Sequence, residues 1–160
     1  MTNWQDISYK EFTSWATAAI VGSMMIYYVS SMLNLDSQGL LSTTTHNQLL
    51  FIVVVATIVT EIIVQTIIAI TKRLEANGPN DERDKTFNLQ ASSISNYFIS
   101  TFVALLILLV SQSDWLLNDV LQIWQPLTNK DILLFVLVLG FGVSQVLHHL
   151  ILAVLYRRGS

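Results

Sequence analysis

Residues 49–73 read LLFIVVVATIVTEIIVQTIIAITKR, and residues 133–157 read LLFVLVLGFGVSQVLHHLILAVLYR. Aligned without a gap, the two stretches share eight identities in twenty-five positions, and most other positions exchange one apolar residue for another. Polar positions also correspond, namely Thr60 with Ser144, Glu61 with Gln145, Gln65 with His149 and Arg73 with Arg157. We therefore predict that the chain contains the same helical hairpin twice. The alternative is a chance resemblance between two apolar hairpins.

The composition indicates that lipid surrounds these helices. Of the 160 residues, 52% are hydrophobic and 12% are charged, and the mean hydropathy is +0.55. Soluble domains carry about 25% charged residues. A helix needs about 20 apolar residues to cross a hydrocarbon core of ~30 Å, and four runs are long enough: about 13–33, 49–71, 91–111 and 132–156. Because helices satisfy their own backbone hydrogen bonds, we predict an all-α integral membrane protein with four transmembrane helices.

The predicted duplication divides the chain into a first transmembrane hairpin, 1–74, and a second, 75–160. Both hairpins have the same orientation, so a pseudo-two-fold axis along the membrane normal would relate them. The polar segment 34–48 is predicted to be a connector. In the other loop, apolar residues recur at helical spacing over 114–124, which predicts an amphipathic helix at the outer membrane interface or a surface for a partner. A similar short element is expected at 3–15, on the inner side.

The distribution of Lys and Arg predicts the orientation. Seven of the eight cations lie in the N-terminal flank, the central loop or the C-terminal tail, and only Lys130 lies in the loop 112–131. Since cytoplasmic flanks are enriched in Lys and Arg, both termini are expected in the cytoplasm. The location expected from this pattern is the inner membrane of a bacterium.

Glu61 is the outstanding candidate for a functional group, because an ionised carboxylate near the middle of a membrane helix is costly and usually functional. Gln65 follows Glu61 by one helical turn, and Gln145 and His149 occupy the equivalent positions of the second hairpin. His148 and His149 point about 100° apart on a helix, so at most one of them faces the core. Because histidine titrates near neutral pH, we predict a proton- or cation-binding cluster. The alternative is a buried hydrogen-bonded cluster that only fixes helix register.

Small residues recur at helix-packing spacing. Ala56 and Thr60 in the second predicted helix correspond to Gly140 and Ser144 in the fourth. Such small-xxx-small patterns allow close packing of membrane helices. With so few helices in the chain, they also favour a homo-oligomer, most simply a dimer.

Several function classes are disfavoured. Cysteine is absent, which excludes disulfides and thiolate chemistry. Metalloprotease, phosphate-binding and dinucleotide-binding motifs are absent, as are basic tracts suited to nucleic acid. We expect no enzymatic activity, no metal and no bound cofactor. Haem or quinone binding through His148 or His149 is a minor alternative, and two axial histidines for haem would require a homodimer.

The central loop carries the charged run Asp81, Glu82, Arg83, Asp84 and Lys85, just before an Ala/Ser/Tyr-rich helix. This DERDK-like segment, over about residues 80–98, resembles a group of small, uncharacterised bacterial membrane proteins. The resemblance implies no activity and no catalytic residues. The run is either the solvated start of a helix or a docking site for a cytosolic partner.

The leading functional hypothesis is a small, non-enzymatic proton or cation transport module, or a channel-like one, built on the Glu61 cluster. The second hypothesis is a structural or regulatory membrane subunit, which docks a partner protein through the DERDK segment and the 114–124 helix. An electron-transfer subunit is the third.

Overall fold

The computed structural model describes residues 8–72, 82–111 and 129–159, and nearly all of them are helical. The helices are α1 (Tyr9–Ser37), α2 (Thr43–Thr71), α4 (Glu82–Ser111) and α6 (Asn129–Gly159). Each contains a segment long and apolar enough to cross a membrane. The chain is therefore all-helical, with four candidate membrane spans, as a multi-pass membrane protein requires. The predicted helix at 114–124 lies outside the described residues. Of the predicted element at 3–15, residues 3–7 lie outside them, and residues 9–15 are the start of α1 rather than a separate element.

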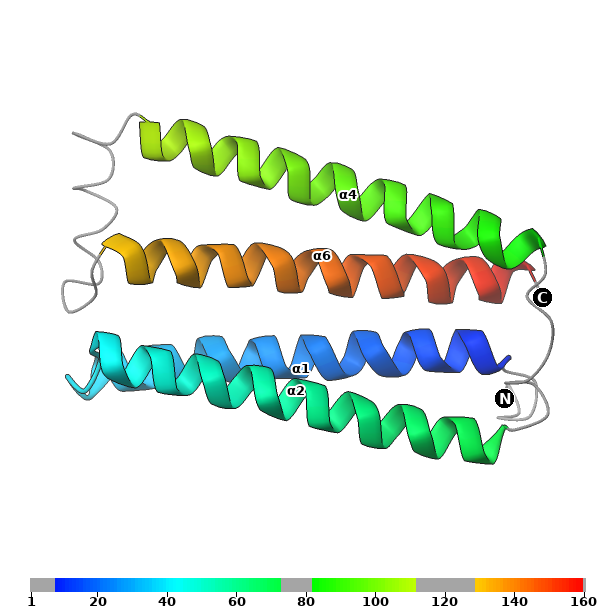
Figure 1. Cartoon of the computed structure of the whole chain (residues 1–160), viewed down its shortest axis with the longest axis horizontal. Coiled ribbons are helices and arrows are strands. Elements are labelled where there is room, and N and C mark those ends of the chain that lie inside the picture. Colours follow the sequence, from blue (N-terminus) through cyan, green and yellow to red (C-terminus); the bar gives the residue numbers. More distant parts are fainter. Residues whose placement is uncertain (1–7, 73–81, 112–128, 160) are drawn as a thin grey trace.

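The four helices run side by side, with α1 and α6 in the middle of the bundle (Figure 1). α2 packs against α1, and α4 packs against α6, so each pair forms a helical hairpin. α2 and α4 lie on opposite sides of the central α1–α6 pair. A pseudo-two-fold axis would match the α1–α6 packing with equivalent packing of α4 on α2, and the described parts of those two helices do not pack as extensively as α1 and α6 do. The duplication therefore stays a prediction from the sequence.

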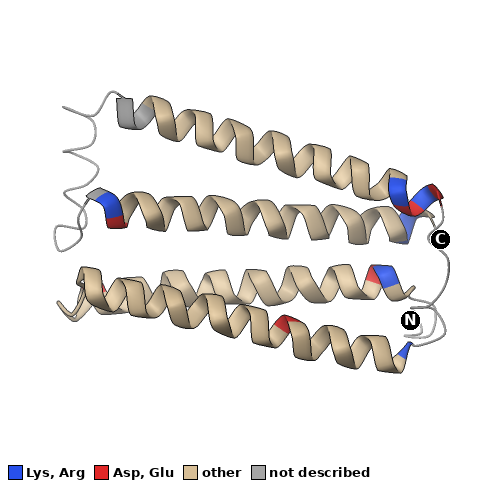
Figure 2. Ribbon diagram, viewed as in Figure 1, with Lys and Arg blue, Asp and Glu red and all other residues tan. Residues whose placement is uncertain are grey.

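The bundle has two distinct ends. We call the end that carries Tyr9, Thr71, Glu82 and Gly159 the terminal end, and the opposite end, where α1 turns into α2, the hairpin end. Figure 2 shows that charged residues gather at both ends of the helices, while an acidic position interrupts α2 well inside its ends. Among the described Lys and Arg residues, only Lys130 lies at the hairpin end.

The α1–α2 turn is short because local hydrogen bonds end one helix and start the next. The Leu40 amide donates to the Leu35 carbonyl at 2.9 Å, and Gly39 adopts a positive φ of 66°, as in a glycine-terminated helix end. Ser42 and Thr45 then cap α2 reciprocally, side chain to backbone. The loop therefore covers only 38–42. The predicted connector 34–48 was too long, because its residues from Thr43 onward already belong to α2.

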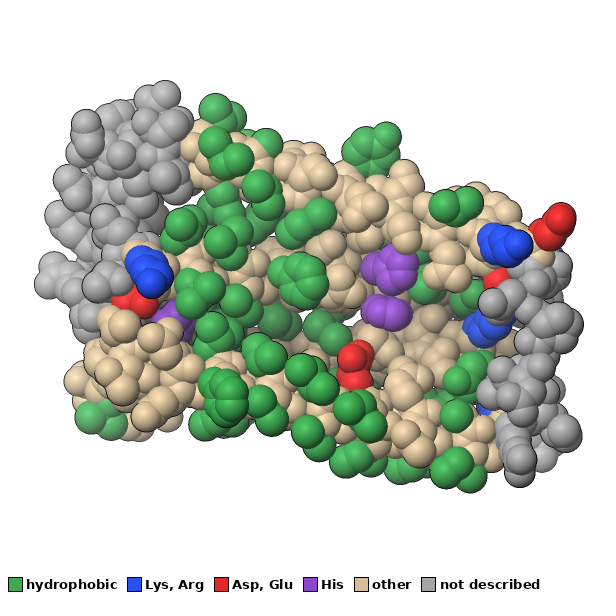
Figure 3. All heavy atoms as spheres, in the orientation of Figure 1, with side chains coloured by type: hydrophobic (Ala, Val, Ile, Leu, Met, Phe, Trp, Pro, Cys, Tyr) green, Lys and Arg blue, Asp and Glu red, His purple; other side chains and the backbone are tan. Residues whose placement is uncertain are grey.

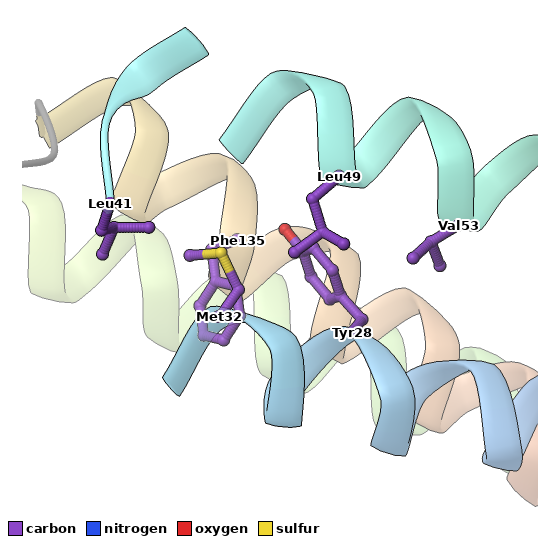
Figure 4. Close-up of a cluster of buried hydrophobic side chains, with 6 residues drawn as sticks. All are labelled: Tyr28, Met32, Leu41, Leu49, Val53 and Phe135. Carbon is purple, nitrogen blue, oxygen red and sulfur yellow. The ribbon is translucent and has the colours of Figure 1, made fainter. Parts of the chain in front are cut away.

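An apolar cluster fastens the hairpin end. Its buried members come from α1, α2, α6 and the short turn (Figure 4): Tyr28, Met32, Leu41, Leu49, Val53 and Phe135. The ring centroids of Tyr28 and Phe135 are 5.3 Å apart, within the range of favourable aromatic pairs. This cluster joins the two hairpins at one end of the bundle.

The outward faces of the helices are strongly apolar (Figure 3). On α2, large side chains such as Phe51, Ile62 and Ile70 are 61–72% exposed. Soluble monomers rarely expose continuous apolar surface on this scale. In a bilayer these side chains would meet lipid, and the bundle would bury only its inner faces.

Candidate functional site

A polar pocket lies between the helices near the terminal end. Its volume is about 300 Å³, and all four helices contribute to its wall. Its lining is mostly polar and consists of Tyr9, Lys10, Thr13, Ser14, Thr17, Gln65, Asn88, His149, Leu152 and Tyr156. Tyr9 and Thr17 are eight residues apart on one helix, so the pocket extends about 12 Å along the bundle. Polar side chains at this depth of a membrane protein are costly unless they face such a cavity.

The α1 side of the pocket is a stripe of hydroxyl groups. Thr13 and Ser14 both donate to the carbonyl of Lys10, at 3.0 and 2.8 Å, while Thr17 lies one turn deeper. Helical spacing places these residues on one face, the face that packs into the bundle. Because a bound hydroxyl keeps acceptor capacity on its oxygen, this stripe can still accept hydrogen bonds from water or a ligand.

Gln65 forms the link between α2 and the pocket. Its Nε2 donates to Thr17 Oγ1 at 2.8 Å, joining α2 to α1. Glu61 lies one turn from Gln65 along α2, where its side chain is half-buried and outside the pocket lining. Among the described residues, Glu61 has no hydrogen-bond or ion-pair partner. The structure therefore places Gln65, and not Glu61, in the pocket wall.

His149 lines the pocket from α6, and His148 does not. The two rings contact each other edge-on, with centroids 5.0 Å apart and an interplanar angle of 89°. His149 Nδ1 is buried and has no hydrogen-bond partner among the described residues. Gln145 is half-buried and lies outside the lining. Of the predicted cluster, the structure thus brings Gln65 and His149 into one cavity and leaves Glu61, Gln145 and His148 outside it.

The rim of the pocket is held by charged residues. Lys10 of α1 forms an ion pair with Asp84 of α4, and Asp84 also accepts a hydrogen bond from the Tyr156 hydroxyl of α6. These interactions tie three helices together at the terminal end. Lys10 and Asp84 are 30% and 16% exposed in their side chains, so the pair is partly shielded from water.

The predicted docking run is mostly the first turn of α4. Arg83 donates to the Gly159 carbonyl at the end of α6 and lies over the Phe87 ring. Asp84 is bound to Lys10, while Glu82 and Lys85 are exposed. Asp81 lies outside the described residues. Arg83 and Asp84 are therefore engaged in contacts within the chain.

The small residues of α6 serve helix packing. A Cβ atom at Gly140 would meet the Phe102 ring of α4 at 2.0 Å, and one at Gly142 would meet Met25 of α1 at 2.4 Å. Ser144 donates to the Ser95 carbonyl of α4 at 3.2 Å. Gly140 and Ser144 thus face α4, and Gly142 faces α1. In α2, Ala56 and Thr60 are half-buried.

A second polar cluster, at the hairpin end, was not predicted from the sequence. Tyr28, His46 and Asp131 are 0%, 0% and 3% exposed. His46 was placed in a connector because the apolar run begins only at residue 49. The signal that could have located it is the cap at Ser42, followed by His46, Leu49 and Val53 at helical spacing. Glu11, buried in the first turn of α1, was also missed.

The fold and the two polar clusters define an all-α membrane protein with a polar cavity between its helices. Compared with known proteins, the chain matches no family model, no curated protein and no solved structure. The resemblance of the DERDK segment to small bacterial membrane proteins stays a prediction.

Proposed function

We propose that this chain is a small, non-enzymatic transport module that conducts protons across a bacterial inner membrane. The observation that carries the proposal is the meeting of Gln65 and His149, from different hairpins, in one polar pocket. An imidazole with a buried, unpartnered nitrogen beside hydroxyl and amide groups is suited to relaying protons. The terminal end would face the cytoplasm, since it carries most of the cations.

The composition of the pocket favours protons over metal cations. Its lining contains hydroxyls, amides, an imidazole and one lysine, but no carboxylate. Hard cations such as Ca²⁺ are bound mainly by carboxylate and carbonyl oxygens. Glu61, half-buried one turn from Gln65, is the next titratable group of α2 toward the hairpin end. It would take the proton beyond the pocket.

The test compares two adjacent histidines with the same chemistry. Purified protein is reconstituted into vesicles that contain a pH-sensitive dye, and proton flux is measured under an imposed pH gradient. We expect His149→Gln to reduce flux about tenfold or more, because the relay loses its titratable group. His148→Gln, which changes the residue outside the pocket lining, is the matched control and should keep most of the flux. If both variants lose proton flux equally, or if neither loses flux, the assigned role of His149 is contradicted.

Docking of a partner protein is supported less well. Arg83 and Asp84 already bind the Gly159 carbonyl and Lys10. A partner that reads these charges would have to displace contacts that hold the terminal end together. Among the described residues of the run, Glu82, Arg83 and Lys85 are exposed, and of these Arg83 already binds the Gly159 carbonyl.

A further inference from the structure

The polar cluster at the hairpin end is built around a fully buried histidine. His46 Nε2 and the Tyr28 hydroxyl are 2.8 Å apart, and both side chains have no exposed surface. The two residues come from different helices, α2 and α1. Around Tyr28 lie the apolar side chains of Met32, Leu49 and Phe135 (Figure 4). A hydrogen-bonded imidazole is thus held inside an otherwise apolar core.

A carboxylate completes the cluster from the other hairpin. Asp131, in the first turn of α6, is 3% exposed and accepts a hydrogen bond of 2.6 Å from Thr43 Oγ1. Thr43 lies three residues before His46 on α2, so the two side chains share one side of the helix. The neighbouring Lys130 is exposed. Tyr28 from α1 thus binds His46 directly, and Asp131 from α6 binds the residue one turn before it on α2.

One nitrogen of His46 is not engaged. Nδ1 is buried and has no hydrogen-bond partner among the described residues. A buried polar atom without a partner is costly, by about 1–3 kcal/mol. In the tautomer with a bare Nδ1, the ring donates from Nε2–H to the Tyr28 oxygen. Nδ1 can then take up a proton and release it again, while the Tyr28 hydrogen bond holds the ring in place.

The His46 cluster and the polar pocket lie at different positions along α1. Tyr28 follows Thr17 by eleven residues, which corresponds to about 16 Å along α1. Between them, the buried α1 residues include the apolar Ala18 and Ile20. The bundle therefore has a polar cluster near each end.

We infer that His46 is a second proton-binding site, near the hairpin end of the bundle, on which the proposed proton transport depends. Tyr28 positions the ring, and the Asp131 carboxylate, bound to Thr43 one turn before His46, would stabilise a positive charge on it. The proton adds to the Nδ1 lone pair and leaves from the same atom, so no other bond is made or broken. The inference rests on the proposed proton transport and adds a separate site to it.

The test uses the same vesicles with His46→Gln, which keeps a hydrogen-bonding side chain but cannot titrate. We expect proton flux to fall about tenfold or more. Asn47→Gln, at the exposed neighbouring position, is the matched control and should keep wild-type flux. If His46→Gln does not fold, as judged by size-exclusion chromatography and thermal melting, Tyr28→Phe is tested in its place. This variant keeps an aromatic ring at position 28 but removes the hydroxyl that holds the His46 imidazole. Its flux should also fall.

The outcomes separate this inference from the proposed function. Wild-type vesicles that conduct protons, together with undiminished flux in the folded His46→Gln variant, would overturn the second site and leave the pocket intact. If only Tyr28→Phe folds, undiminished flux in that variant would likewise overturn the second site. Wild-type vesicles that conduct no better than protein-free ones would overturn the proposed function, and the second site with it.

Discussion

Gln65 of α2 donates a 2.8 Å hydrogen bond to Thr17 of α1, at the deep end of the polar pocket. Thr17 is 7% exposed, and this bond joins α1 to α2 near the terminal end, as the Tyr28–His46 bond does near the hairpin end. In bacteriorhodopsin, hydrogen bonds between membrane helices average about 0.6 kcal/mol. The bond therefore stabilises the fold modestly, while it fixes the side chain that lines the cavity.

We predict that Thr17→Val destabilises the protein by about 1 kcal/mol, because the Gln65 amide loses its hydrogen-bond acceptor on α1. Equilibrium unfolding in detergent micelles measures the change. Thr66→Val is the control, since the Thr66 hydroxyl bonds only to the Ile62 carbonyl of its own helix. Equal stability of Thr17→Val and Thr66→Val would show that the interhelical bond contributes nothing.

The Lys10–Asp84 ion pair should contribute to stability at the terminal end. Partly exposed ion pairs are typically worth about 0.2–1 kcal/mol, so Lys10→Ala should cost about that amount. Exchanging the two residues, with Lys10→Asp and Asp84→Lys together, should recover part of the loss relative to either reversal alone. Lys85→Ala, at an exposed position, should change the unfolding free energy little. A double exchange no better than the single reversals would argue against the pair.

Gly140 and Gly142 allow a paired packing test. Gly140→Ala forces the Phe102 ring to move, and Gly142→Ala meets the flexible Met25 side chain. Overpacking costs typically 1–3 kcal/mol, and methionine adapts more readily than an aromatic ring. We therefore expect Gly140→Ala to lower the thermal midpoint more than Gly142→Ala does. Adding Phe102→Leu should restore part of the Gly140→Ala loss. The reverse order of the two glycine variants would contradict this packing.

The sequence was sufficient to predict the four helices, because long apolar runs with few charges leave little choice of secondary structure. Their ends were predicted less well. α1 and α2 extend beyond their apolar cores, to Ser37 and back to Thr43, because polar helical turns carry no hydropathy signal. This is why His46 was assigned to a connector.

The candidate site could be predicted only in part. Spacing identified Gln65 and His149 as polar positions of membrane helices, and the structure brings both to one pocket. Spacing could not show that Gln65 donates a hydrogen bond to Thr17, because that contact depends on which helices are neighbours. The predicted symmetry would have α2 and α6 converge, whereas α2 packs mainly on α1. Glu61 is consequently outside the pocket lining.

The central claim is that this chain conducts protons through its polar interior. The most direct test is proton flux in vesicles that contain the purified wild-type protein, driven by a pH gradient and compared with protein-free vesicles. We expect faster, protein-dependent acidification that persists when K⁺ and Na⁺ are replaced by an impermeant cation. A membrane-permeant anion balances the charge, so that no ionophore is needed. Acidification no faster than in protein-free vesicles would contradict the claim.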